Sequence, residues 1–108
     1  MIYELREYTA NIGQLPALQA RFREHTTKLF EKHGMVNVGY WTNTVGGSSD
    51  ALVYILAFAD HGAREKSWAA FQSDPEWQRV RAETEKDGPL THHIVNRIMT
   101  PTDFSALK

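Results

Sequence analysis

The sequence contains no cysteine, which excludes disulfide bonds, thiolate metal sites and iron–sulfur clusters. It also lacks an excess of charge, since 12 Lys and Arg stand against 13 Asp and Glu. We therefore expect neither nucleic acid nor a membrane surface as a partner. No apolar run approaches a membrane span, and charged residues interrupt the N-terminal segment where a signal peptide would be apolar. These absences predict a soluble, cytoplasmic protein.

The chain has room for one domain. It has 108 residues, of which 42% are hydrophobic, enough for one compact core and too few for two ordinary ones. No linker, low-complexity tract or internal repeat divides it. Residues 1–108 are therefore expected to form a single domain.

The first half of the chain predicts a strand, a helix and two more strands. Apolar and charged residues alternate over 2–9, which is the period of a strand. A helical stripe follows at spacings of three and four, and its positions are Leu15, Leu18, Phe22, His25 and Leu29. His33 and Gly34 are typical of a helix end. The runs 35–42 and 51–58 flank a turn-rich loop and predict a hairpin.

The second half predicts another helical region and a last strand. The helical region begins after Asp60 and is broken at Asp74-Pro75, where the aspartate can cap a new helix and proline fits its first turn. A turn over 86–89 closes it, and the strand 92–99 and the tail 101–108 follow. The order βαββαβ predicts an α+β, ferredoxin-like split βαβ sandwich, with an antiparallel sheet and both helical regions on one face.

The strand over 52–58 is apolar at successive positions, whereas a sheet with helices on one side and water on the other should alternate. Something must therefore cover the second face, and the chain has too few helices to do so. A second copy of the same sheet is the expected cover. The sequence thus predicts a homodimer through the sheet faces.

Several stretches together resemble the NIPSNAP family: MIYELREYT, FEKHGMVNVGYW, VYILAF, AREKSWAAFQSDPEW, KDGPL and PTDFS. The resemblance spans nearly the whole chain and places it with the dimeric α+β barrel proteins. It implies a dimer whose two sheets close face to face into a barrel, and it does not imply a reaction. The same fold group contains cofactor-free monooxygenases and haem-degrading enzymes, which use a pocket between helices and sheet.

His25 is the candidate catalytic residue, because it occupies the apolar stripe where a leucine would be expected. In a poorly solvated cavity it could act as a general base and remove a phenolic proton. The alternative is a core or rim histidine bonded to a backbone carbonyl. His33, by contrast, is expected to serve only as a helix-terminal residue.

Large rings are numerous for so small a domain and could line a pocket for an aromatic ligand. The alternative is that they are simply core. The pocket residues that we single out are Trp41, Tyr54, Trp68, Trp77 and His92.

No metal or cofactor is expected. His92 and His93 are neighbours on a strand and face opposite ways, while His25 and His33 lie about 12 Å apart along a helix axis. Arg6, on the first strand, is expected to pair with a nearby carboxylate such as Glu4 or Glu7 and not to bind an anion.

Three functions stay open. The dimer could bind a small apolar or aromatic molecule between helices and sheet. It could instead be a cofactor-independent monooxygenase in which His25 deprotonates an electron-rich substrate that then reduces oxygen. The third possibility is a non-catalytic scaffold or interaction protein with a filled core. A cavity of about 300 Å³ or more beside His25 and the tryptophans would favour a ligand binder or an enzyme over the scaffold, and a filled interior there would exclude the enzyme.

Overall fold

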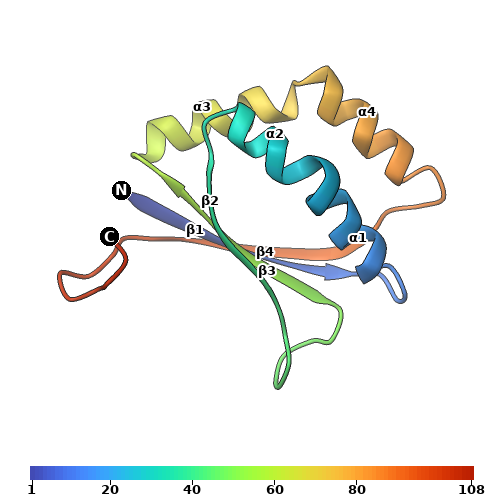
Figure 1. Ribbon diagram of the computed structural model, residues 1–108, viewed down its shortest axis with the longest axis horizontal. Coiled ribbons are helices and arrows are strands. Elements are labelled where there is room, and N and C mark those ends of the chain that lie inside the picture. Colours follow the sequence, from blue (N-terminus) through green and yellow to red (C-terminus); the bar gives the residue numbers. More distant parts are fainter.

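The computed structural model describes all residues, 1–108, and has a four-stranded antiparallel sheet with every helix on one face (Figure 1). The strands are β1 (Ile2–Ala10), β2 (Val36–Thr42), β3 (Ala51–Phe58) and β4 (Thr91–Met99). They lie side by side in the order β2-β3-β1-β4. The predicted α+β, ferredoxin-like fold is confirmed.

The helices are α1 (Leu15–Arg21), η1 (Phe22–Thr26), α2 (Thr27–Lys32), α3 (His61–Gln72) and α4 (Pro75–Thr84). The first three run on without a break. They end as predicted at His33-Gly34, where Gly34 has a φ of +80° that favours glycine. The predicted break at Asp74-Pro75 is also confirmed, because the Asp74 carboxylate accepts a 2.8 Å hydrogen bond from the N–H of Glu76 and caps α4.

One feature of the first helix differs from the expected regular α-helix. Residues 22–26 form a turn of π-helix, whose hydrogen bonds reach five residues along the chain. The Thr27 hydroxyl also donates to the Phe22 carbonyl at 3.0 Å. Each residue of this wider turn advances by a smaller angle, so the buried stripe passes through Thr26 and leaves His25 only half-buried. The expected place of His25 in the apolar stripe is therefore wrong.

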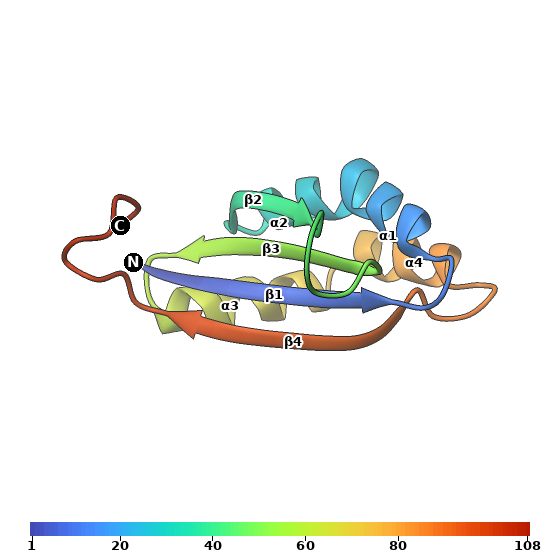
Figure 2. The ribbon, with the colours of Figure 1, turned by 90° about the horizontal axis from the view of Figure 1, so that it is seen from below.

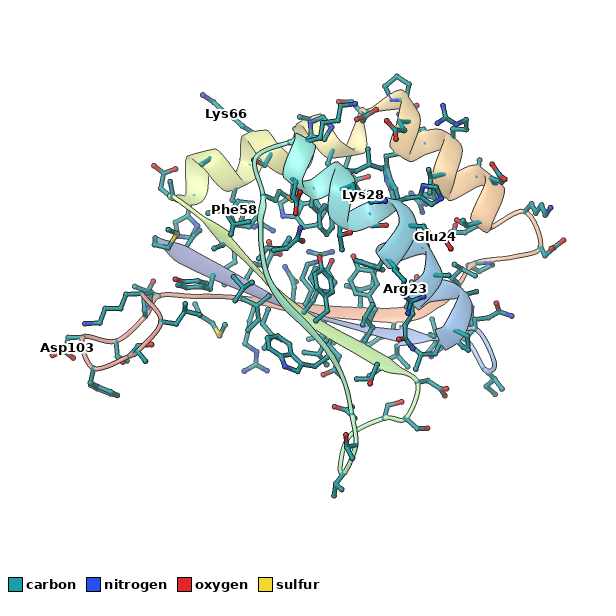
Figure 3. All side chains as sticks on the ribbon, in the orientation of Figure 1. Arg23, Glu24, Lys28, Phe58, Lys66 and Asp103 are labelled. Carbon is teal, nitrogen blue, oxygen red and sulfur yellow. The ribbon has the colours of Figure 1, made fainter.

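The inner face of the sheet, which the helices cover, carries the even-numbered residues of β1. The register of β1 with β3 and β4 sets Glu4 opposite Leu56 and Ile98, and Arg6 opposite Tyr54 and Asn96. Side chains fill the space between this face and the helices, whereas Lys66 projects away from it (Figure 3). The core includes Leu18, Phe22, Leu29, Phe30, Met35, Tyr54, Leu56 and Phe71.

No helix covers the outer face of the sheet, which is the near side in Figure 2. The register gives this face the alternate residues of β3, which are Ala51, Val53, Ile55 and Ala57. Trp41 of β2 and Val95 of β4 are 51% and 43% exposed on the same side. β3 is thus apolar on both faces, as the sequence indicates. None of the helices has the length and apolar composition that crossing a membrane requires.

Candidate functional site

A cavity of about 150 Å³ lies between the helices and the β1–β4 half of the sheet. Its floor comes from β1 and β4, and its walls come from η1, α2, α3 and α4 together with the last residue of α1. Ile94 of β4 lines it and is 44% exposed. The cavity therefore opens along the β4 edge, which the helices cover least.

Aromatic rings make up most of its apolar lining. Trp68 and Trp77, from the two helices after β3, face rings of β1 and of the first helical region across the cavity. Neighbouring rings pack edge-on or tilted, with centroids 5.5 Å apart for Phe30–Trp68 and 4.7 Å for Phe71–Trp77. The aromatic lining residues are Tyr8, Phe22, Phe30, Trp68, Phe71 and Trp77.

Charged residues also line this cavity, and Arg6 reaches it from the inner face of β1. Its side chain is only 15% exposed, and its guanidinium carbon lies 4.5 Å from the centroid of the Trp68 ring, a distance typical of cation–π contacts. One Arg6 nitrogen, Nη1, donates to Glu4 at 2.9 Å. The expected pairing of Arg6 with Glu4 is confirmed, but the Nε atom is buried without a hydrogen-bond partner.

Glu4 is a fully buried carboxylate, 0% exposed, that links both layers of the domain. It accepts hydrogen bonds from Arg6, from both Nε and Nη2 of Arg64, from the Trp68 indole and from Asn96, at 2.8 to 3.0 Å. Burial by itself raises the pKa of Glu4. The bonds from Arg64, Asn96 and Trp68 and the charge of Arg6 outweigh it, so this pKa falls from 4.5 to about 2. Glu4 is thus ionised at neutral pH and fixes two cavity side chains, Arg6 and Trp68.

Arg21, the last residue of α1, lines the opposite wall and is 5% exposed. Its Nη1 atom donates to Glu85 at 3.0 Å and to Thr84 at 3.3 Å. Its guanidinium carbon lies 5.3 Å from the centroid of the Trp77 ring, and its Nε atom is also buried without a partner. Arg81 reaches the same Glu85 carboxylate at 3.6 Å.

The structure brings two of the predicted pocket residues, Trp68 and Trp77, to one cavity and places the others elsewhere. Trp41 is half-exposed on the outer face and His92 is exposed on β4. Tyr54 is buried in contact with the lining rings of Tyr8 and Phe22 but does not itself line the cavity. His25, the predicted base, does not line the cavity either. Whether any of these side chains binds a ligand stays a prediction.

Glu4, Arg21 and Arg6 are the cavity groups whose importance the sequence interpretation missed. A signal existed for Arg21, because it follows Leu18 by three residues and precedes Phe22, which places it on the buried stripe of the helix. For Glu4 the signal is weaker. Its partners Arg64, Trp68 and Asn96 are 60 or more residues away in the chain, where no periodicity connects them.

Two wider grooves lie on the surface. One, of about 230 Å³, runs between α1, η1 and the β2–β3 hairpin and has Arg23 as its one charged lining residue. The other, of about 260 Å³, lies between the outer face and the C-terminal tail and has no charged lining residue. The cavity between helices and sheet therefore combines enclosure with charge, and it is the candidate site.

Few side chains at this site could donate or accept a proton in a reaction. The Tyr8 hydroxyl accepts a 2.9 Å hydrogen bond from Tyr54, whose own pKa is raised by burial, so that Tyr54 stays neutral at physiological pH. Glu85 is held by two arginines. Across the chain, no three His, Asp or Glu side chains are grouped so as to hold a metal ion.

Known proteins of similar sequence and structure support the fold assignment. Protein Atu4242 from Agrobacterium tumefaciens is 29% identical, and the alignment covers both chains fully with a TM-score of 0.87. Atu5224 from the same organism, a NIPSNAP family protein, is 25% identical over 99% of this chain and 98% of its own, also with a TM-score of 0.87. No curated protein matches the sequence significantly.

A more distant structure shares the fold alone. SnoaB, a cofactor-independent oxygenase from Streptomyces nogalater, is 14% identical over 99% of this chain and 97% of its own, with a TM-score of 0.64. The NIPSNAP family model, in contrast, matches residues 3–106, which is nearly the whole chain. The chain therefore belongs to the NIPSNAP family.

Proposed function

We propose that the protein is a homodimer that binds a small, ring-containing molecule in the cavity between helices and sheet. The observation that carries this proposal is the partly enclosed cavity with aromatic walls. Its volume of about 150 Å³ is near that of a cavity known to hold benzene (~150 Å³) and well below the ~300 Å³ at which drug-sized sites begin. A ligand with a single ring fits this space.

Binding is better supported than base-catalysed oxygenation. The oxygenase hypothesis requires a base beside the substrate, and the half-buried His25 does not line the cavity. Glu85, the one carboxylate that does, is paired with Arg21 and Arg81. The likeness to SnoaB concerns the fold and supplies no residue to this argument.

The dimer is supported by the composition of the outer face. Its central strand presents Val53 and Ile55 there, and Trp41 and Val95 lie exposed on the flanking strands. Glu7 is a charged residue among them, since the register sets it between Val53 and Val95. Apolar side chains gathered on one face stabilise the protein only when they are covered, and a second copy of the same sheet is the cover that we propose.

The dimer is tested with Trp41→Glu and, as a matched control, Val45→Glu. Val45 is 93% exposed in the loop after β2, outside the sheet. We expect the wild type and the control to sediment as dimers at micromolar concentration and the Trp41 variant to sediment as a folded monomer. A wild-type monomer, or a variant that dimerises as tightly as the wild type, contradicts the proposed interface.

Ligand binding is tested by titrating benzyl alcohol into ¹⁵N-labelled protein and following the three tryptophan indole N–H signals. Two of the indoles, those of Trp68 and Trp77, belong to cavity residues, and that of Trp41 lies on the outer face. We expect saturable shifts of the first two and none of the third. Equal shifts of all three, or shifts that never saturate, would indicate non-specific contact and contradict the proposed site.

A further inference from the structure

The cavity carries positive charge in excess of what the protein neutralises. Arg6 and Arg64 share the single carboxylate of Glu4, and Arg21 and Arg81 share that of Glu85. Four guanidinium groups thus share two carboxylates, and three of the four, those of Arg6, Arg21 and Arg81, line the cavity. The whole chain has a formal net charge of −1, so this local excess is not a general property of its surface.

Two of these arginines are also poorly solvated. The side chains of Arg6 and Arg21 are 15% and 5% exposed, and each has an Nε atom buried without a hydrogen-bond partner. Water can therefore solvate these two charges only poorly. A buried charge without a full complement of partners is unfavourable, and an anion placed beside it removes part of that penalty.

Both carboxylates are already paired with arginines of the chain. Glu4 accepts hydrogen bonds from four side chains on three elements, and Glu85 bridges Arg21 and Arg81. The next charge that approaches the cavity arginines must come from outside the chain. Guanidinium groups suit a carboxylate in particular, because their planar N–H donors match its two oxygens.

The aromatic neighbours define the rest of the ligand. Arg6 lies against the Trp68 ring and Arg21 against the Trp77 ring, at 4.5 and 5.3 Å from their centroids. A planar ring attached to the carboxylate would contact these indoles and Phe71. A flexible aliphatic acid would have to lose rotational freedom to fill the same space.

We propose that the cavity selects a small planar carboxylate with one aromatic ring, in which the ring contacts the indoles and the carboxylate lies against Arg6 and Arg21. This inference rests on the proposed function of the cavity and adds the charge and class of the ligand. Benzoate is the probe that matches it in size.

The test compares benzoate with two partial mimics on the wild-type protein. Benzamide keeps the ring and is neutral, and acetate keeps the charge and has no ring. With the indole signals of Trp68 and Trp77 as the readout, we expect benzoate to bind at least about tenfold more tightly than benzamide, the difference that a charge-assisted hydrogen bond produces. Acetate is expected to bind more weakly than benzoate by at least the same factor.

The outcomes separate the inference from the function on which it rests. If benzamide or benzyl alcohol binds in the cavity as tightly as benzoate, the cavity is a site for rings and the charge selection is refuted. Binding of acetate as tight as that of benzoate would refute the requirement for a ring. If no ring compound shifts the cavity indoles, the proposed function fails, and the ligand class fails with it.

Arg21→Gln provides a second test, with Arg79→Gln as its matched control. Arg79 is an exposed arginine of α4 that does not line the cavity. We expect Arg21→Gln to lower benzoate affinity about tenfold and to leave benzyl alcohol affinity unchanged, while the control changes neither. Equal loss for both ligands would mean that Arg21 only maintains the cavity. If Arg21→Gln does not fold, the wild-type comparison of benzoate with benzamide decides the question by itself.

Discussion

Replacing Glu4 with glutamine should destabilise the protein, because it removes a buried, ionised carboxylate. The carboxylate is 0% exposed, and its Oε2 atom accepts bonds from Arg6, Arg64 and Asn96. Glutamine keeps the size of the side chain, but it turns one acceptor into an NH₂ donor that faces other donors. It also leaves the two arginines without their shared negative charge.

The size of the effect follows from the pKa. The pKa of Glu4 falls from 4.5 to about 2, because hydrogen bonds and the charge of Arg6 outweigh the desolvation that raises it. A shift of this size corresponds to a stabilisation on the order of 3 kcal/mol by the ionised form. Losing one partner of a buried ion pair costs about the same, ~3–5 kcal/mol.

The pH dependence has a definite sign. Because the folded-state pKa lies below the unfolded one, the contribution of Glu4 is fully present above about pH 4.5 and is lost as the pH falls through about 2. Glutamine does not titrate. The difference in stability between wild type and Glu4→Gln should therefore be largest near neutral pH and shrink steadily below pH 4.5.

Urea unfolding followed by circular dichroism measures this difference. The wild type and the variant are compared at one fixed protein concentration, because the proposed dimer would make stability depend on concentration. Glu24→Gln is the control, since Glu24 is exposed on η1. A difference that stays constant from pH 7 to pH 2.5, or that is absent at pH 7, would refute the role given to the buried carboxylate.

Three further predictions concern single side chains. Trp68→Phe keeps a ring but removes the indole donor to the buried carboxylate, so it should lower the free energy of unfolding by about 1.5–3 kcal/mol, measured in urea. Asp74→Asn should lower the unfolding midpoint at pH 7, because bonds from Lys32 and His33 lower the pKa of Asp74 in the folded state. The loss should shrink progressively as the pH falls below the usual pKa of 3.8, because the unfolded wild-type chain then binds a proton that the folded carboxylate does not. His25→Ala should leave the benzyl alcohol titration of the indole signals unchanged, since His25 does not line the cavity, and a tenfold loss of affinity would reopen its role as a base.

Periodicity and turn chemistry predict the order of the elements because both are local properties of the chain. The helix end at Gly34, the cap at Asp74 and the hairpin over β2 and β3 depend on neighbouring residues. The π-turn over 22–26 has no such signal. One extra residue per turn changes which side chain is buried, and Thr26 takes the place expected for His25.

The site was harder to predict because the polar side of β1 faces inward. Leu5 alternates with Glu4 and Arg6, and this alternation does not say which of the two faces of β1 the helices cover. Apolar residues usually face the helices, but here Glu4 and Arg6 do so. Leu5 lies on the outer face, where a second sheet is proposed to cover it. Glu4 and Arg6 lie inside, where Arg64, Trp68 and Asn96 supply bonds from distant parts of the chain. Hydrophobic side chains could fill this core without the cost of burying charge. The inward-facing charges of β1 therefore support the proposal that the interior holds a binding site.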